Sequence, residues 1–95
     1  MALDLYSKTD SNLYWRTSYH HWNRIVALVN VVSPKHDLEV GKTLSAEESL
    51  ELSERLREWD ILGRLNEYDK RFSINSESIR SLYHFLKVAG EVEIT

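Results

Sequence analysis

The chain has 95 residues, a formal net charge of -3 and no cysteine, and 42% of its residues are hydrophobic. These values fit a single domain over residues 1–95 with one hydrophobic core, and they exclude disulfides, thiol catalysis and cysteine-based zinc sites. The acidic and basic residues are mixed along the chain, so nucleic-acid and anionic-membrane binding are not favoured. We expect a cytoplasmic bacterial or phage protein, because no segment has the pattern of a signal peptide or a membrane span.

The N-terminal residues favour a β-hairpin. Leu3 and Leu5 alternate with other residue types, which predicts a short half-buried strand, and a polar turn cluster follows at residues 7–12. Residues 13–16 form either the second strand of the hairpin or an early helical turn. The hairpin is slightly preferred, although Trp15 lies at helical spacing from Trp22, which keeps the helix open as an alternative.

The stretch from Tyr19 to Val32 predicts a central helix. Apolar residues recur at intervals of three and four on two adjoining stripes, from Trp22 to Val29 and from Ile25 to Val32. The many β-branched residues would also suit a strand, but the helical pattern extends upstream to Tyr19. We expect this helix to be mostly buried, with other elements on at least two sides.

A long connection runs from Ser33 to Thr43. Its Pro34 and Gly41 are typical of loops, and we expect Leu38 and Val40 to reach the core. Such a connection is usually a surface crossover.

A capping box of Ser45 and Glu48 opens a second helix, which is predicted to reach about Leu62. Its inner stripe contains Leu52, Leu56 and Trp59.

Four residues of this second helix lie off its inner stripe and are candidate partner-binding residues: Leu50, Glu54, Arg57 and Ile61. The two apolar members project from the opposite face, with the charged pair between them. A helix that contacts the core at both ends would give the same pattern, and single exposed apolar residues are common on protein surfaces.

The C-terminal third predicts one more helix and a strand. Asn75 or Ser76 caps a helix whose apolar stripe runs from Ile79 to Leu86, and Gly90 suits a left-handed C-cap. Residues 91–95 then predict a terminal edge strand that pairs with residues 3–6. The preceding segment, 64–72, is either an extension of the second helix or a loop that inserts Tyr68 and Phe72 into the core.

Together these elements predict an α+β fold. About three helices would pack on a small two- or three-stranded antiparallel sheet formed by the N- and C-terminal strands. The order resembles a family of small bacterial proteins without an assigned activity. The matching features are Trp22 to Leu28, Gly41, Ser45 to Leu56, Phe85-Leu86, Gly90, Val92 and Ile94. Glu91 departs from that pattern, where a second glycine is expected, and the resemblance implies a fold order but no catalytic residue.

The residues offer little support for catalysis or metal binding. His20 and His21 are adjacent, so on a helix they point about 100° apart and cannot easily share a metal ion, with or without His84. There is no nucleophile elbow and no glycine-rich phosphate loop. Arg16 and Arg24 with Tyr14 and Tyr19 could form a small basic-aromatic patch, but they also suit the rim of the central helix. We therefore expect no enzyme, no cofactor and no metal.

The leading interpretation is a small non-enzymatic domain that binds another protein, with an immunity- or inhibitor-type protein as one concrete version. The alternative is a small-molecule or metal-binding domain that uses the region of His20 and His21. A third possibility is self-association through the terminal strand or the face that carries Leu50 and Ile61.

Overall fold

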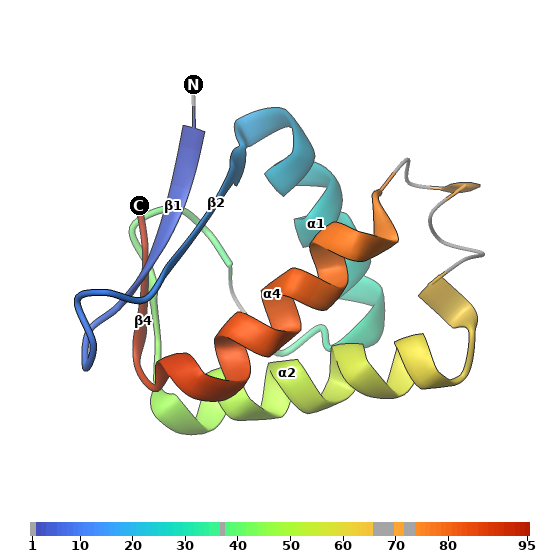
Figure 1. Ribbon diagram of the computed structural model, residues 1–95. Helices are drawn as coiled ribbons and strands as arrows, with labels where there is room; N and C mark the ends of the chain where they lie inside the picture. Colours follow the sequence, from blue (N-terminus) through green and yellow to red (C-terminus); the bar gives the residue numbers. More distant parts are fainter. Residues whose placement is uncertain (1, 37, 66–69, 72–73) are drawn as a thin grey trace.

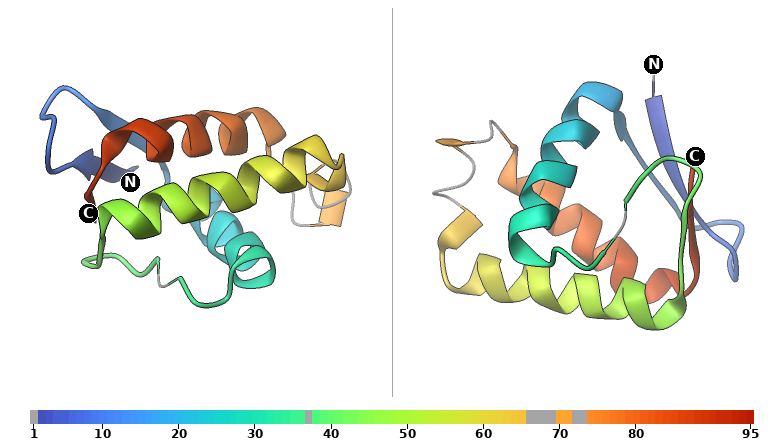
Figure 2. Two further views of the ribbon diagram at one scale, coloured as in Figure 1. Left: turned by 90° about the horizontal axis from the view of Figure 1, so that it is seen from below. Right: turned by 180° about the vertical axis from the view of Figure 1, so that it is seen from behind.

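The computed structural model describes residues 2–36, 38–65, 70–71 and 74–95, and these form a two-layer α+β domain (Figure 1). The helices lie on one side of the sheet and leave its other face open (Figure 2). The elements in chain order are β1 (Ala2–Ser7), β2 (Tyr14–Ser18), α1 (Tyr19–Val32), β3 (Thr43–Leu44), α2 (Ala46–Ile61), α4 (Ser76–Ala89) and β4 (Val92–Ile94).

The sheet has four antiparallel strands in the order β2-β1-β4-β3. The expected sheet of two or three strands was therefore too small, because the chain beyond α1 adds β3 beside β4, where Leu44 lies opposite Val92. The pairing of the two chain ends is confirmed, since Leu5 lies opposite Ile94. The C-terminal strand was expected at an edge, but β4 lies inside the sheet, and β2 and β3 form its edges.

The structure resolves the alternative for residues 13–16 in favour of the hairpin. Tyr14 to Ser18 form β2, and Trp15 lies opposite Leu5 of β1. The Trp15 indole is buried under α4, where its Nε1 donates a hydrogen bond to Ser81 Oγ at 3.1 Å. The hairpin is therefore fixed by a tertiary contact as well as by its own ladder.

Helix α1 has the predicted bounds, with Ser18 as its N-cap and Ser33 as its C-cap. The helix is less buried than predicted, since we expected other elements on at least two of its sides. Only one side of it is buried, by Trp22, Ile25, Leu28, Val29 and Val32, while Asn30 and Val31 are exposed. The most extensively packed pair of helices is instead α2 and α4.

The packing of α2 against α4 rests on the predicted apolar stripes and on a buried serine. Leu52 and Leu56 of α2 are fully buried, as is Leu82 of α4. The small side chain of Ser53 lets the helices approach, and its Oγ donates a hydrogen bond of 2.5 Å to the carbonyl oxygen of Tyr83. The predicted capping box at the start of α2 is present, with both of its bonds formed.

The end of α4 is held by the β1–β2 hairpin. The Oγ atoms of Ser7 and Thr9 both donate to the carbonyl oxygen of Ala89, at 2.5 and 3.0 Å. Gly90 has the expected positive φ of 70°, but its ψ of -133° differs from the predicted left-handed C-cap. The chain therefore turns directly into β4 through a conformation that only glycine adopts readily.

Replacing Gly90 by alanine is expected to lower the free energy of unfolding by about 2 kcal/mol, because a Cβ there would meet Thr9 Oγ1 at 2.9 Å in a strained backbone. Urea unfolding measures the change. Gly63→Ala is the matched control, since Gly63 has a φ of 72° and no heavy atom within 4 Å of the added Cβ. An equal loss in both variants would show that the contact with Thr9 contributes nothing.

The prediction that two residues of the loop after α1 reach the core is confirmed for only one of them. Leu38 is buried, as predicted, but Val40 is 50% exposed and does not reach the core. It lies beside the turn at Gly41, whose N–H is bound to the carbonyl oxygen of Ile94, and this anchors the backbone without burying the side chain. The expected insertion of Tyr68 and Phe72 falls outside the described residues.

Candidate functional site

The four candidate residues of α2 share an exposed side of that helix, but they do not form one apolar patch. Leu50 is 44% exposed and Ile61 is 67% exposed. They are eleven positions apart, which corresponds to about 16 Å along a helix, and the exposed Glu54 and Arg57 lie between them. This surface therefore has mixed charge and two separate apolar points.

The acidic residues of α2 do not form an uninterrupted acidic surface either. Glu48 is used by the capping box, and Glu51 forms an ion pair with Lys35 from the loop after α1. This pairing with the Lys35 ammonium lowers the pKa of Glu51. Arg55 and Arg57 add positive charge to the same exposed stretch.

The three histidines considered as metal ligands, His20, His21 and His84, each contact different neighbours. His20 accepts a hydrogen bond from Arg24 at 2.8 Å, and His21 Nδ1 is hydrogen-bonded to Thr17 Oγ1 at 2.9 Å. Burial, and then the positive charge of Arg24, lowers the pKa of His21. His84 lies on α4, with its ring 4.8 Å from the ring of Tyr83. Within the described ranges, no group of three or more His, Cys, Asp or Glu side chains could hold a metal ion.

An aspartate at the end of α2 connects this helix to α4. Arg80 donates to both carboxylate oxygens of Asp60 at 3.1 to 3.2 Å, and the hydroxyl of Tyr83 donates to Oδ2 at 2.6 Å. The hydrogen bond from Arg80 is the main cause that lowers the pKa of Asp60. Burial, and then the bond to Asp60, raises the pKa of Tyr83.

This arrangement is suited to holding the two helices together. Both oxygens of Asp60 are occupied by donors from α4, and its side chain is only 15% exposed. A carboxylate with a lowered pKa and engaged oxygens is a poor proton acceptor for a substrate. We therefore assign Asp60, Arg80 and Tyr83 a structural role.

The open face of the sheet carries a cluster of exposed aromatic and charged side chains. Alternation along each strand places one set of side chains under the helices and the other set on this face. Strand pairing aligns Tyr14, Tyr6, Glu93 and Thr43 in a row across all four strands. A second row brings Arg16 beside Asp4. We call the surface formed by these six residues the open face.

Two tyrosines dominate the open face. Tyr6 is 41% exposed and Tyr14 is 60% exposed, and their ring centroids are 6.2 Å apart. Beside them, Arg16 Nε donates to Asp4 Oδ1 at 2.7 Å. This contact with the carboxylate raises the pKa of Arg16 and fixes the direction of its side chain. The open face therefore presents two aromatic rings and an oriented guanidinium on paired strands.

The sequence identified part of this surface in a different combination. It placed Tyr14 and Arg16 with Tyr19 and Arg24, but the structure does not bring these four together. Tyr19 packs against the core at the start of α1, whereas Tyr14 and Arg16 lie on the sheet. The alternation predicted for the first strand already separated Tyr6 from the buried Leu3 and Leu5, which the structure confirms, but the sequence did not identify Tyr6 as a candidate binding residue.

Comparisons with protein-family models, with curated proteins and with solved structures find no match to this chain. The resemblance to a family of small bacterial proteins therefore stays a prediction. None of the helices in the described part of the chain has the length and apolar character needed to cross a membrane.

Proposed function

We propose that this chain is a non-enzymatic protein-binding domain and that the open face is its contact surface. The observation that carries this proposal is the pair of exposed tyrosines beside an oriented arginine on a bare sheet face. Tyrosine and arginine are enriched among the residues that dominate binding energy at protein interfaces.

The strand pairing of the open face supports the same proposal. Tyr6 and Tyr14 stand on paired strands, and Arg16 donates a hydrogen bond to Asp4, so the backbone of this face is ordered before a partner binds. The face also carries both signs of charge, because Asp4 and Glu93 accompany Arg16. A protein partner with apolar and mixed polar groups would match such a surface.

A purely structural role for the tyrosine pair makes a different prediction. A cross-strand aromatic pair stabilises a sheet by only about 0.2–1 kcal/mol. If this were its whole role, replacing Tyr14 by threonine would cause a small loss of stability and no loss of binding. If the open face binds a partner, the same change removes an exposed anchor from the interface.

The test is capture of proteins from the native host with the tagged chain, followed by mass spectrometry. We expect one protein to be captured in stoichiometric amount by the wild type. Capture by Tyr14→Thr is expected to fall at least about tenfold, which corresponds to about 1.4 kcal/mol of binding free energy. Thermal unfolding of both proteins checks that the variant is folded.

The matched control is Ile61→Thr on α2, which removes a side chain of similar exposure from the alternative surface. We expect this variant to capture the same protein as the wild type. Loss of capture with Ile61→Thr but not with Tyr14→Thr would move the interface to Leu50, Glu54, Arg57 and Ile61. Absence of any captured protein would contradict the proposal.

An immunity- or inhibitor-type role that uses the acidic residues of α2 is a competing version of protein binding. It predicts that reversing the charges of Glu47, Glu51 and Glu54 abolishes binding to a basic partner, whereas an interface on the open face predicts that binding is retained. The pairing of Glu51 with Lys35 reduces the negative charge available for that contact. We place the action of the protein in the bacterial cytoplasm, a proposal supported by the absence of cysteine from the chain.

A further inference from the structure

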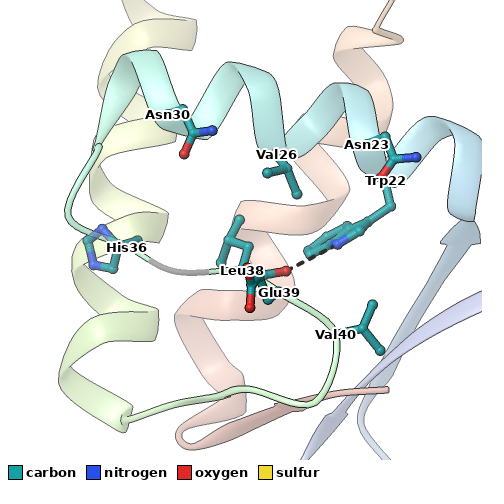
Figure 3. A pocket seen from close by; sticks show the side chains of 8 residues that line it. All are labelled: Trp22, Asn23, Val26, Asn30, His36, Leu38, Glu39 and Val40. Atoms are coloured by element: carbon teal, nitrogen blue, oxygen red, sulfur yellow. Dashed lines mark hydrogen bonds between the residues drawn. The ribbon is translucent and has the colours of Figure 1, made fainter.

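A cavity of about 350 Å³ lies between α1 and the loop that follows it (Figure 3). One wall is a stripe of α1 with Trp22, Val26 and Asn30 at spacings of four residues. The other wall is the loop segment 38–40, from which the Leu38 side chain projects toward α1. This volume is at the lower end of the range found for small-ligand sites in proteins.

The walls of the cavity are fixed by hydrogen bonds to the helix and to the sheet. The indole Nε1 of Trp22 donates to the carbonyl oxygen of Leu38 at 3.3 Å (Figure 3). Farther along the loop, the N–H of Gly41 donates to the carbonyl oxygen of Ile94 at 2.7 Å. These two contacts hold the segment 38–41 against α1 and the sheet before a ligand binds.

The lining combines an apolar floor with a polar rim. Trp22 and Leu38 are almost fully buried and form the deep apolar part of the lining, and the half-exposed Val40 lies nearer the surface. The exposed polar side chains of the lining are Asn23, Asn30 and Glu39. A ligand for this site therefore needs a short apolar part and a polar group.

The charges of the lining favour a cation. Among the described lining residues, Glu39 supplies a carboxylate and none is lysine or arginine, and the one histidine of the lining, His36, is buried. The carboxamide of Asn30 projects toward the loop and offers a further acceptor oxygen (Figure 3). Glu39 also makes an interaction within the chain. An ionised carboxylate has about four acceptor positions, so it can bind an additional donor.

We propose that this cavity binds a small organic cation, with an ammonium group on a short aliphatic chain. The aliphatic part packs against Val26 and Val40, and the ammonium group donates to Glu39. The same chemistry occurs in a free alkylamine and in a lysine side chain of a protein partner. This site is separate from the open face and does not depend on the function proposed for that face.

The test is a nuclear magnetic resonance titration of the nitrogen-15-labelled chain at pH 7. The probes are n-butylamine, n-butanol, sodium butyrate and Nα-acetyl-lysine amide. The indole N–H of Trp22 lies in the cavity, whereas that of Trp15 is bound to Ser81 under α4 and serves as an internal control. We expect n-butylamine to shift the Trp22 signal with a dissociation constant of about 1 mM, and to leave the Trp15 signal unchanged.

Variants of two exposed glutamates provide the second arm. Glu39→Gln is expected to weaken n-butylamine binding at least about fivefold, and Glu93→Gln on the open face is expected to have no effect. Tighter binding of n-butylamine than of the blocked lysine would assign the site to a free amine, and the reverse order would assign it to a lysine side chain. Butyrate or butanol binding as tightly as n-butylamine, or no shift of Trp22 with any probe, would overturn the proposal.

Discussion

Replacing Leu56 by alanine is expected to lower the free energy of unfolding by about 3 kcal/mol. Leu56 is fully buried on the side of α2 that packs against the core, so its removal loses apolar burial and leaves a cavity. For a domain of this length, the loss corresponds to a fall of roughly 15 °C in the melting temperature. Thermal and urea unfolding measure the two quantities.

Leu50→Ala is the control for this prediction, because Leu50 is on the same helix but is 44% exposed. We expect it to change the free energy of unfolding by less than about 1 kcal/mol. Similar losses in both variants would contradict the packing of α2 described above, since they would mean that the two sides of this helix are equally buried.

The second large effect is expected at Asp60, where three groups on two helices meet. Replacing Asp60 by asparagine removes a charged acceptor for Arg80 and Tyr83, and we expect a loss of about 2 kcal/mol at pH 7. Glu54→Gln, at an exposed position on the same helix, is the control and is expected to change stability by less than about 0.5 kcal/mol.

The pH dependence of the stability difference between the wild type and Asp60→Asn shows whether the charge of Asp60 causes it. The folded state lowers the pKa of Asp60 below its ordinary value of about 3.9, so the ionised form stabilises the fold above that pH. The stabilisation is lost as the pH falls through the lowered pKa. The difference in the free energy of unfolding between wild type and Asp60→Asn should therefore be constant above about pH 5 and should become smaller below about pH 4. A difference that stays constant down to pH 2 would show that the charge of Asp60 is not involved.

The helices could be predicted because their signals are local. The capping box at Ser45, the N-cap at Asn75 and the stripe from Trp22 to Val32 each lie within the element that they specify. The hairpin was only slightly preferred over an early helical turn at residues 13–16, because Trp15 fits both patterns locally. The fourth strand could not be predicted, because the two residues Thr43 and Leu44 contain no periodic pattern and become a strand only by pairing with β4.

The candidate sites depend on contacts between distant parts of the chain. Asp60 and Arg80 are twenty positions apart, and no local pattern links them. Tyr6 and Tyr14 come together only when the hairpin register is known, because a shift of β2 by one residue would turn Tyr14 to the buried face, away from Tyr6. The sequence could therefore name Tyr14 and Arg16 as an aromatic and basic pair, but it could not place them on an open sheet.

The central claim is that the open face binds another protein, and the most direct test is a resonance spectrum of the nitrogen-15-labelled chain in unlabelled extract of the native host. We predict that the amide signals of Asp4, Tyr6, Tyr14, Arg16 and Glu93 broaden or shift selectively, and that Tyr14→Thr abolishes the effect. Broadening confined to the amides of Leu50 through Ile61, or a spectrum identical to that in buffer, would contradict the claim.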